Sequence, residues 1–184
     1  MEIGPRIRKL RVRQGRTLAE IAKVCGFTRS LLSKIENGRT TPPIATLLKI
    51  ADALGVKPAA LLSESAASGP VYLSAAQASR SRRVTTEKGY TFLPFASGRG
   101  DKLMEPTLIE LRKGKVSAGS LKHGGEEFLY VLEGEMRYRV GKVTYALGPG
   151  DTLYFDAEEA HDFEAVSKTV RYLCVFVQPA PGRN

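Results

Sequence analysis

The spacing of the hydrophobic residues changes along this chain. In the first 64 residues they recur at positions i, i+3, i+4 and i+7, as in Leu18, Ile21, Ala22 and Cys25, which is the pattern of one buried helix face. From residue 107 onward, segments such as FLYVLEGEMRYRV and TVRYLCVFV are rich in β-branched and aromatic residues, which is typical of short strands. We therefore predict two domains, the first all-α and the second all-β.

Capping residues indicate where the helices of the first domain begin and end. Thr17 and Glu20 have the spacing of a capping box, in which each side chain satisfies a free backbone amide at the helix start. Gly26 ends that helix, and Thr28 caps the next one. Together with the apolar periodicity, these signals predict five short helices over residues 1–64.

The composition changes between the two domains. From residue 63 to residue 81 the chain is rich in Ser, Ala and Gly, which favours a linker. We therefore predict a linker over 65–82 and the strand domain over 83–184. Several short strands at close spacing predict a sandwich or a barrel for this second domain.

The positive charge is concentrated at the beginning of the chain. The net charge is +9, and residues 1–64 hold 12 Lys and Arg against 5 Asp and Glu, whereas residues 92–184 hold 12 against 13. A basic first domain favours a polyanionic partner such as DNA. No apolar run approaches the roughly 20 residues of a membrane span, so we expect no membrane partner. Without a secretory signal and with Cys25 and Cys174 in separate apolar segments, we expect a cytoplasmic protein with reduced thiols.

The segment 17–39 has the order of a helix-turn-helix, whose second helix would start at Thr28. Leu32 and Ile35 must face the core, which leaves the other side of this helix to enter the major groove of DNA. The predicted base-reading residues are Thr28, Arg29, Ser30, Ser33 and Lys34. The predicted phosphate contacts are Thr17, Asn37, Arg39 and Thr40.

The stretch IRKLRVRQGRTLAEIAKVCGFTRSLLSKIENGRTTPPIATLLKIADALGV resembles the helix-turn-helix family of phage repressors and Cro proteins, the XRE family. The resemblance implies that Arg11 and Glu36 form a structural pair between the first and third helices. It also implies double-stranded operator DNA as the partner. The alternative is a small helical bundle that binds another protein.

Both histidines of the chain lie in the strand domain, in GSLKHGGEEFLYVLEG and GPGDTLYFDAEEAHDF. Leu121, His123 and Glu127 share one parity, so in a continuous strand His123 and Glu127 would point into the barrel together. His161 follows in the second segment. This constellation predicts a polar site inside the barrel.

These two segments resemble the motifs of the cupins, small jelly-roll barrels also described as double-stranded β-helices. In the first motif His123, Glu127 and Gly134 match, while Leu121 replaces the first histidine and Lys115 the leading glycine.

In the second cupin motif Gly150 and His161 match. Asp156, Glu158 and Ala165 replace its proline, second glycine and asparagine. The resemblance implies a cupin fold with an incomplete set of metal ligands. The expected effector pocket comprises Leu121, His123, Glu127, Leu129, His161 and Phe163.

Three interpretations of the pocket remain open. His123, Glu127 and His161 can hold a divalent metal, with Zn, Fe and Ni as candidates. Alternatively, the histidines form hydrogen bonds to Glu127 inside the barrel, or they bind a polar group of an organic effector directly. Leu121 makes the wall of the pocket apolar where a fourth ligand would lie.

The combination of the two domains resembles bacterial transcription regulators that sense a metabolite. We expect a homodimer that binds an operator with two half-sites and whose DNA affinity responds to a ligand in the barrel. Phe128, Tyr130 and Leu132 either form the dimer contact or pack on the second sheet. The alternative function is a metal-dependent cupin enzyme of the dioxygenase or isomerase type with an accessory DNA-binding domain. No catalytic residue is assigned.

Overall fold

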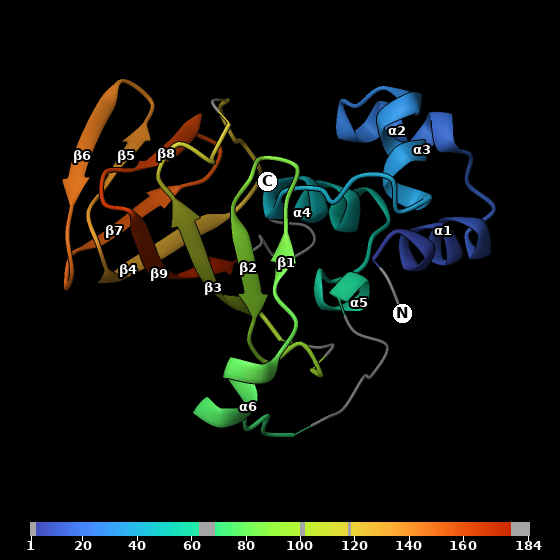
Figure 1. The fold of residues 1–184 in the computed structure, drawn as a ribbon. Coiled ribbons are helices and arrows are strands. Elements are labelled where there is room, and N and C mark those ends of the chain that lie inside the picture. The colour runs from blue at the N-terminus through green and yellow to red at the C-terminus, as the bar shows by residue number, and fades with distance from the viewer. Residues whose placement is uncertain (1–2, 63–68, 100–101, 118, 178–184) are drawn as a thin grey trace. The chain divides into compact units, whose positions relative to one another are not determined.

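The computed structural model describes residues 3–62, 69–99, 102–117 and 119–177, which form two compact units. The first unit comprises Met1–Val71 with Ser97–Lys102, and the second comprises Tyr72–Ala96 with Leu103–Asn184. Within these described ranges, the first unit contains five helices, and the second contains one short helix and the strands. Both units are drawn in Figure 1. Among the described residues, no helix has both the length and the apolar character needed to cross a membrane.

Where the structure describes the helical unit, it has five helices, as the sequence predicts. They are α1 (Ile3–Arg13), α2 (Leu18–Cys25), α3 (Arg29–Glu36), α4 (Ile44–Ala53) and α5 (Ala59–Leu62). The Thr17–Glu20 capping box at the start of α2 is confirmed, and so is the Thr28 cap of α3. Gly26 ends α2 with a φ of 68°, a left-handed conformation that glycine adopts without the strain of a side chain.

The core of this unit collects the apolar faces of all five helices. Its most buried side chains include Ile7, Ile21, Leu32, Ile35, Ile50 and Leu61. Beside this core, Arg11 of α1 donates two hydrogen bonds to Glu36 of α3, at 2.6 Å from Nε and 2.7 Å from Nη2. The predicted structural pair is therefore confirmed, and it fastens α1 to the helix that carries the predicted base-reading residues.

A short helix, α6 (Ala75–Arg80), lies within the segment predicted as a linker. It begins with a capping box between Ser74 and Gln77, and none of its residues is buried. Residues 63–68 of the predicted linker lie outside the described residues. The boundaries predicted at 64 and 82 stay predictions, since composition reports flexibility and solvation better than it reports where packing begins.

The described part of the second unit contains nine strands in two antiparallel sheets. The strands are β1 (Val84–Thr85), β2 (Thr91–Pro94), β3 (Met104–Arg112), β4 (Glu126–Glu133), β5 (Met136–Val140), β6 (Val143–Leu147), β7 (Thr152–Asp156), β8 (His161–Ala165) and β9 (Thr169–Val177). One sheet has the order β1-β2-β3-β9-β4-β7 and the other β6-β5-β8. This arrangement confirms the predicted all-β cupin barrel (Figure 1).

Alternation along β4 separates the inside of the barrel from its outside. Glu127, Leu129 and Val131 are buried, whereas the residues between them are exposed: Phe128 by 38%, Tyr130 by 39% and Leu132 by 48%. Within one chain, therefore, these three apolar side chains do not pack on the second sheet.

Candidate functional site

Helix α3 has one buried face and one exposed face. Leu32, Ile35 and Glu36 are buried, which confirms the predicted orientation of the helix. Arg29, Ser30 and Lys34 are exposed, and Ser33 is half-buried. The exposed face therefore carries two cations and a hydroxyl group, and all three can donate hydrogen bonds to base edges.

Two of the residues predicted to contact DNA also cap helices. The Thr28 hydroxyl oxygen accepts a hydrogen bond from the Leu31 amide at 3.1 Å, and Thr17 accepts one from the Glu20 amide at 3.2 Å. Both lie at helix N-termini, where free backbone amides attract anions such as phosphate. A contact with DNA at either residue stays a prediction.

The predicted phosphate contacts after α3 lie in the following turn. Asn37 caps the end of α3, and its side-chain nitrogen Nδ2 donates a 2.8 Å hydrogen bond to the Ser33 carbonyl. Arg39 is exposed and Thr40 is half-buried.

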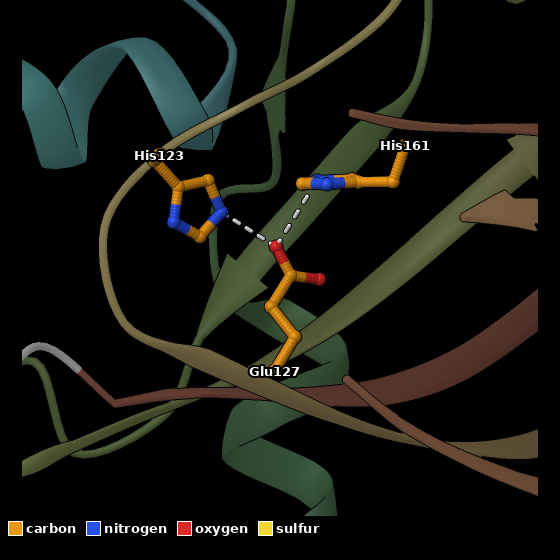
Figure 2. A group of neighbouring side chains, drawn as sticks. All are labelled: His123, Glu127 and His161. Carbon is orange, nitrogen blue, oxygen red and sulfur yellow. Dashed lines mark hydrogen bonds and ion pairs between the residues drawn. The ribbon is translucent and has the colours of Figure 1, made fainter. Parts of the chain in front are cut away.

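In the barrel, three buried side chains converge: His123, Glu127 and His161. One ligand atom from each lies within 4.8 Å of the others. The Nε2 atom of His123 is 2.6 Å from Oε1 of Glu127, and the Nε2 atom of His161 is 3.4 Å from the same oxygen (Figure 2). The sequence identified all three members of this cluster.

The predicted continuous strand from Leu121 to Glu127 is wrong. Strand β4 starts at Glu126, and Leu121 forms only an isolated antiparallel bridge with His161. The cause is the Gly124–Gly125 pair, in which Gly125 has a φ of 90°. His123 nevertheless points inward, because the segment before β4 runs beside the chain that leaves β7. The backbone amide of His123 donates to the Ala157 carbonyl at 3.0 Å.

Both imidazole rings are held in one tautomer. The Nδ1 atom of His123 is 3.0 Å from the Gly124 carbonyl oxygen, and that of His161 is 2.8 Å from the Glu159 carbonyl oxygen. A carbonyl oxygen only accepts hydrogen bonds, so each Nδ1 carries a proton and each Nε2 faces Glu127. In neutral histidines both Nε2 atoms are acceptors that face a carboxylate, so a cation or a proton must lie between them.

Two findings about the electrostatics agree with this conclusion. Burial alone would raise the pKa of the Glu127 carboxyl, but the polar contacts and the charge of His123 and His161 lower the pKa to about 2. The Nε2 atom of His161, which is completely buried, has no hydrogen-bond partner among the described residues. Glu127 therefore stays ionised, and one nitrogen beside it has its lone pair or its proton unsatisfied.

Aromatic rings surround the cluster. Tyr138 stacks on His161 with centroids 6.3 Å apart, Phe155 meets the same imidazole edge-on at 5.0 Å, and Phe176 lies 5.9 Å from His123. These three aromatic residues were not among the predicted pocket residues. For Tyr138 and Phe176, the one indication in the sequence was their position in the strand alternation. Each lies at an inward position of its strand, MRYRV or TVRYLCVFV, between exposed or half-buried neighbours.

Tyr138 and one further residue that was not predicted, Cys174, contact the other oxygen of Glu127. The Tyr138 hydroxyl is 3.3 Å from Oε2 and the Cys174 thiol is 3.4 Å from it. Burial, and to a lesser extent the charge of Glu127, raises the pKa of both groups, so each stays protonated and donates.

The remaining predicted pocket residues are Leu121, Phe163 and Leu129. Leu121 exchanges both backbone hydrogen bonds with His161, at 2.7 and 3.0 Å, which puts the two side chains on the same face of the pair. The rings of Phe163 and Tyr138 have centroids 5.6 Å apart. Leu129 is buried on the inner face of β4, two residues beyond Glu127.

The chain matches two protein families in successive segments. Residues 7–61 match the family HTH_3, described as helix-turn-helix, and residues 107–176 match Cupin_2, described as a cupin domain. The chain is therefore a transcriptional regulator that joins a helix-turn-helix domain of the HTH_3 type to a cupin domain.

Similar proteins match this chain over most of its length. The regulator is 25% identical over 167 residues to the HTH-type transcriptional regulator PuuR of Escherichia coli (strain K12), covering 89% of this chain and 88% of that protein. An HTH_3 family transcriptional regulator from Vibrio cholerae has a crystal structure with a TM-score of 0.74 and 23% identity, covering 97% of this chain and 96% of that one. The crystal structure of FeII HppE gives a TM-score of 0.50 at 20% identity, with coverage of 95% and 97%, and shares the fold alone.

The donors in the barrel of the regulator are compatible with a metal site. Two imidazole nitrogens and a carboxylate oxygen form a set that binds divalent transition metals. The hydrogen bonds from each Nδ1 to a backbone carbonyl are the contacts that usually orient a metal-binding histidine.

Proposed function

We propose that this regulator is a homodimer whose affinity for an operator changes when a ligand binds in its cupin barrel. Two copies are needed because one recognition helix reads only a few base pairs, so useful specificity takes an operator with two half-sites. We also assign the regulator to the cytoplasm, where Cys25 and Cys174, both free and buried, would remain thiols.

In this proposal the exposed face of α3 reads the operator. Arg29 and Lys34 donate to guanine O6 and N7, while Thr28, Ser30 and Ser33 contact neighbouring base edges. Phosphate contacts from Thr17, Asn37, Arg39 and Thr40 fix the register of the helix. The exposed, basic character of this face supports the assignment.

We further propose that a divalent metal, such as Zn, Fe or Ni, is held by His123, Glu127 and His161. The observation that carries this proposal is the convergence of three buried acceptor atoms within 4.8 Å, with both histidines protonated on the far nitrogen. A bound metal supplies positive charge and open coordination positions for an effector. Leu121 and the aromatic rings supply the apolar wall against which that effector packs.

Replacing His161 by alanine is expected to remove metal binding. Wild-type protein purified without chelators should carry about one equivalent of metal by elemental analysis, and the variant less than about 0.1 equivalent. The affinity of the wild type should fall as the pH falls, because a proton on either Nε2 atom competes with the metal.

The matched control for this experiment is Asp162→Asn. Asp162 is the next residue of β8, but its side chain forms an ion pair with Arg139 of β5 instead of facing Glu127. This variant should keep the metal. A wild type free of metal would contradict the metal proposal and favour histidines that bind an organic effector or Glu127 alone.

The β1–β2 turn contacts the chain segment that precedes Leu121 and His123 of the barrel site. Lys88 Nζ donates to the Gly119 carbonyl at 2.6 Å, and the Ser117 amide donates to the Lys88 carbonyl at 2.8 Å. A side chain at Gly89 would lie 1.9 Å from the Lys115 carbonyl oxygen, so only glycine allows this approach. We infer that ligand-induced movement of the segment leading to Leu121 and His123 passes to β1, which directly follows the linker.

The outer face of β4 is our proposed dimer contact. Replacing Tyr130 by glutamate should convert the dimer to a monomer, because a charge would enter an apolar interface, and should weaken operator binding. Multi-angle light scattering measures the mass directly. The control is Val143→Glu on the other sheet, where an apolar residue is exposed by 52% against 39% for Tyr130. A monomer from this variant alone would assign the contact to β6.

The same three donors also suit a metal-dependent enzyme of the dioxygenase or isomerase type. We favour a sensor because the site lies in a chain with a helix-turn-helix domain. A sensor returns its ligand unchanged, whereas an enzyme converts many equivalents for each protein molecule. Mass spectrometry of a ligand recovered after long incubation with excess ligand distinguishes the two, and turnover would contradict our choice.

A further inference from the structure

Glu127 uses its two oxygens differently. Oε1 faces His123 and His161, at 2.6 and 3.4 Å. Oε2 faces away from both and lies 3.3 Å from the Tyr138 hydroxyl and 3.4 Å from the Cys174 thiol. Tyr138 and Cys174 are each only 1% exposed, so solvent does not compete for these contacts.

The two contacts to Oε2 come from opposite walls of the barrel. Tyr138 lies on β5 in the three-stranded sheet, and Cys174 lies on β9 in the six-stranded sheet, next to the Glu127 strand β4. Because a carboxylate oxygen only accepts hydrogen bonds, the phenol and the thiol are both donors here. The carboxylate therefore cannot rotate toward the histidines without losing two buried donors.

We propose that Tyr138 and Cys174 are positioning residues that make Glu127 a ligand through one oxygen only. This inference rests on the metal site proposed above. With Oε2 engaged by the two donors, Oε1 alone completes the set with the two Nε2 atoms. The remaining coordination positions are then left for an effector instead of being filled by the second carboxylate oxygen.

The size of the effect follows from the general behaviour of groups that orient metal ligands. Losing such a partner typically weakens metal affinity by about 10- to 100-fold. We expect Tyr138→Phe and Cys174→Ala each to fall at the lower end of this range, because each leaves Oε2 with one remaining donor. The double variant should be weaker than either.

The test is a Co2+ titration of the metal-free, full-length protein, followed by its visible absorption spectrum. Tyr138→Phe and Cys174→Ala should bind Co2+ roughly tenfold more weakly and lose absorption intensity, because a freed carboxylate adds its second oxygen and raises the coordination number. Cys174→Ser keeps a donor and should stay closer to the wild type in both readouts.

Two matched controls exclude a loss of packing. Tyr172→Phe removes the hydroxyl of another fully buried tyrosine in the barrel, and Cys25→Ala removes the other buried thiol, in the helical unit. Neither should change Co2+ affinity or the spectrum. The melting temperature of each variant verifies that the barrel remains folded.

The outcomes separate this inference from the proposal on which it rests. Wild-type protein that takes up no Co2+ would overturn the metal site itself, and the inference with it. Wild type that binds, with both variants equal to it, would overturn the positioning role alone. Weaker binding with an unchanged spectrum would also overturn that role, because it would report altered packing without a second carboxylate oxygen on the metal.

Discussion

Replacing Arg29 and Lys34 together by alanine is expected to abolish sequence-specific operator binding. Each side chain that reads a guanine edge contributes about 1–3 kcal/mol of discrimination, and the proposed dimer would lose every such contact twice. The affinity should therefore fall at least ~100-fold and approach that for random DNA. Fluorescence anisotropy measures this on a duplex that the wild-type protein selects from a random library.

The control for this experiment is Lys142→Ala, which removes an exposed cation from the β5–β6 turn of the barrel. It should leave operator binding intact. Arg39→Ala gives a second comparison, since loss of a phosphate contact should weaken binding to all sequences alike and reduce the salt dependence. Undiminished operator binding by the Arg29–Lys34 variant would show that α3 is not the reading helix.

Replacing Glu36 by alanine is expected to destabilise the helical domain by about 3–5 kcal/mol, because Arg11 would keep a buried guanidinium without its carboxylate partner. Both residues are buried, and the two hydrogen bonds between them are short. Arg11 cannot escape this penalty by losing its proton, because a guanidinium is too basic to be deprotonated in a protein. Urea denaturation followed by circular dichroism at helical wavelengths reports the change.

A double variant tests whether the buried charge causes this loss. Arg11→Met with Glu36→Leu removes both charges and keeps similar volumes, and it should recover most of the lost stability. If the double variant were as unstable as Glu36→Ala, the unpaired charge would not be the cause. The loss would then come from the hydrogen bonds that hold α1 and α3 in their relative orientation. Either variant also disturbs α3, so operator binding should follow the folded fraction.

The helical domain was predictable from its sequence because its signals are local. The Thr17–Glu20 capping box, the Thr28 cap and the left-handed Gly26 each concern residues within one or two turns of one another. The pairing of Arg11 with Glu36 spans 25 residues, and it was reached through family resemblance instead of periodicity.

The barrel site was predictable only in part. Alternation in β4 assigned Glu127 to the inside, but the strand assumed before it does not exist, and His123 reaches the site from a loop held against the Ala157 carbonyl. Tyr138 and Cys174 were missed because their contact with Glu127 depends on strand register. Cys174 lies directly opposite Leu129 across β4 and β9, and no local pattern encodes such a pairing between distant segments.

Strand β4 carries the candidate ligand Glu127 on one face and the exposed Phe128 and Tyr130 on the other. Successive side chains of a strand alternate, so inserting or deleting one residue within β4 would exchange the two faces. A phenylalanine would then enter the polar cluster, and a carboxylate would stand on the apolar surface. We therefore expect a change of length within β4 to disrupt both faces, so a redesign of the ligand preference of this regulator should proceed by substitution at inward positions.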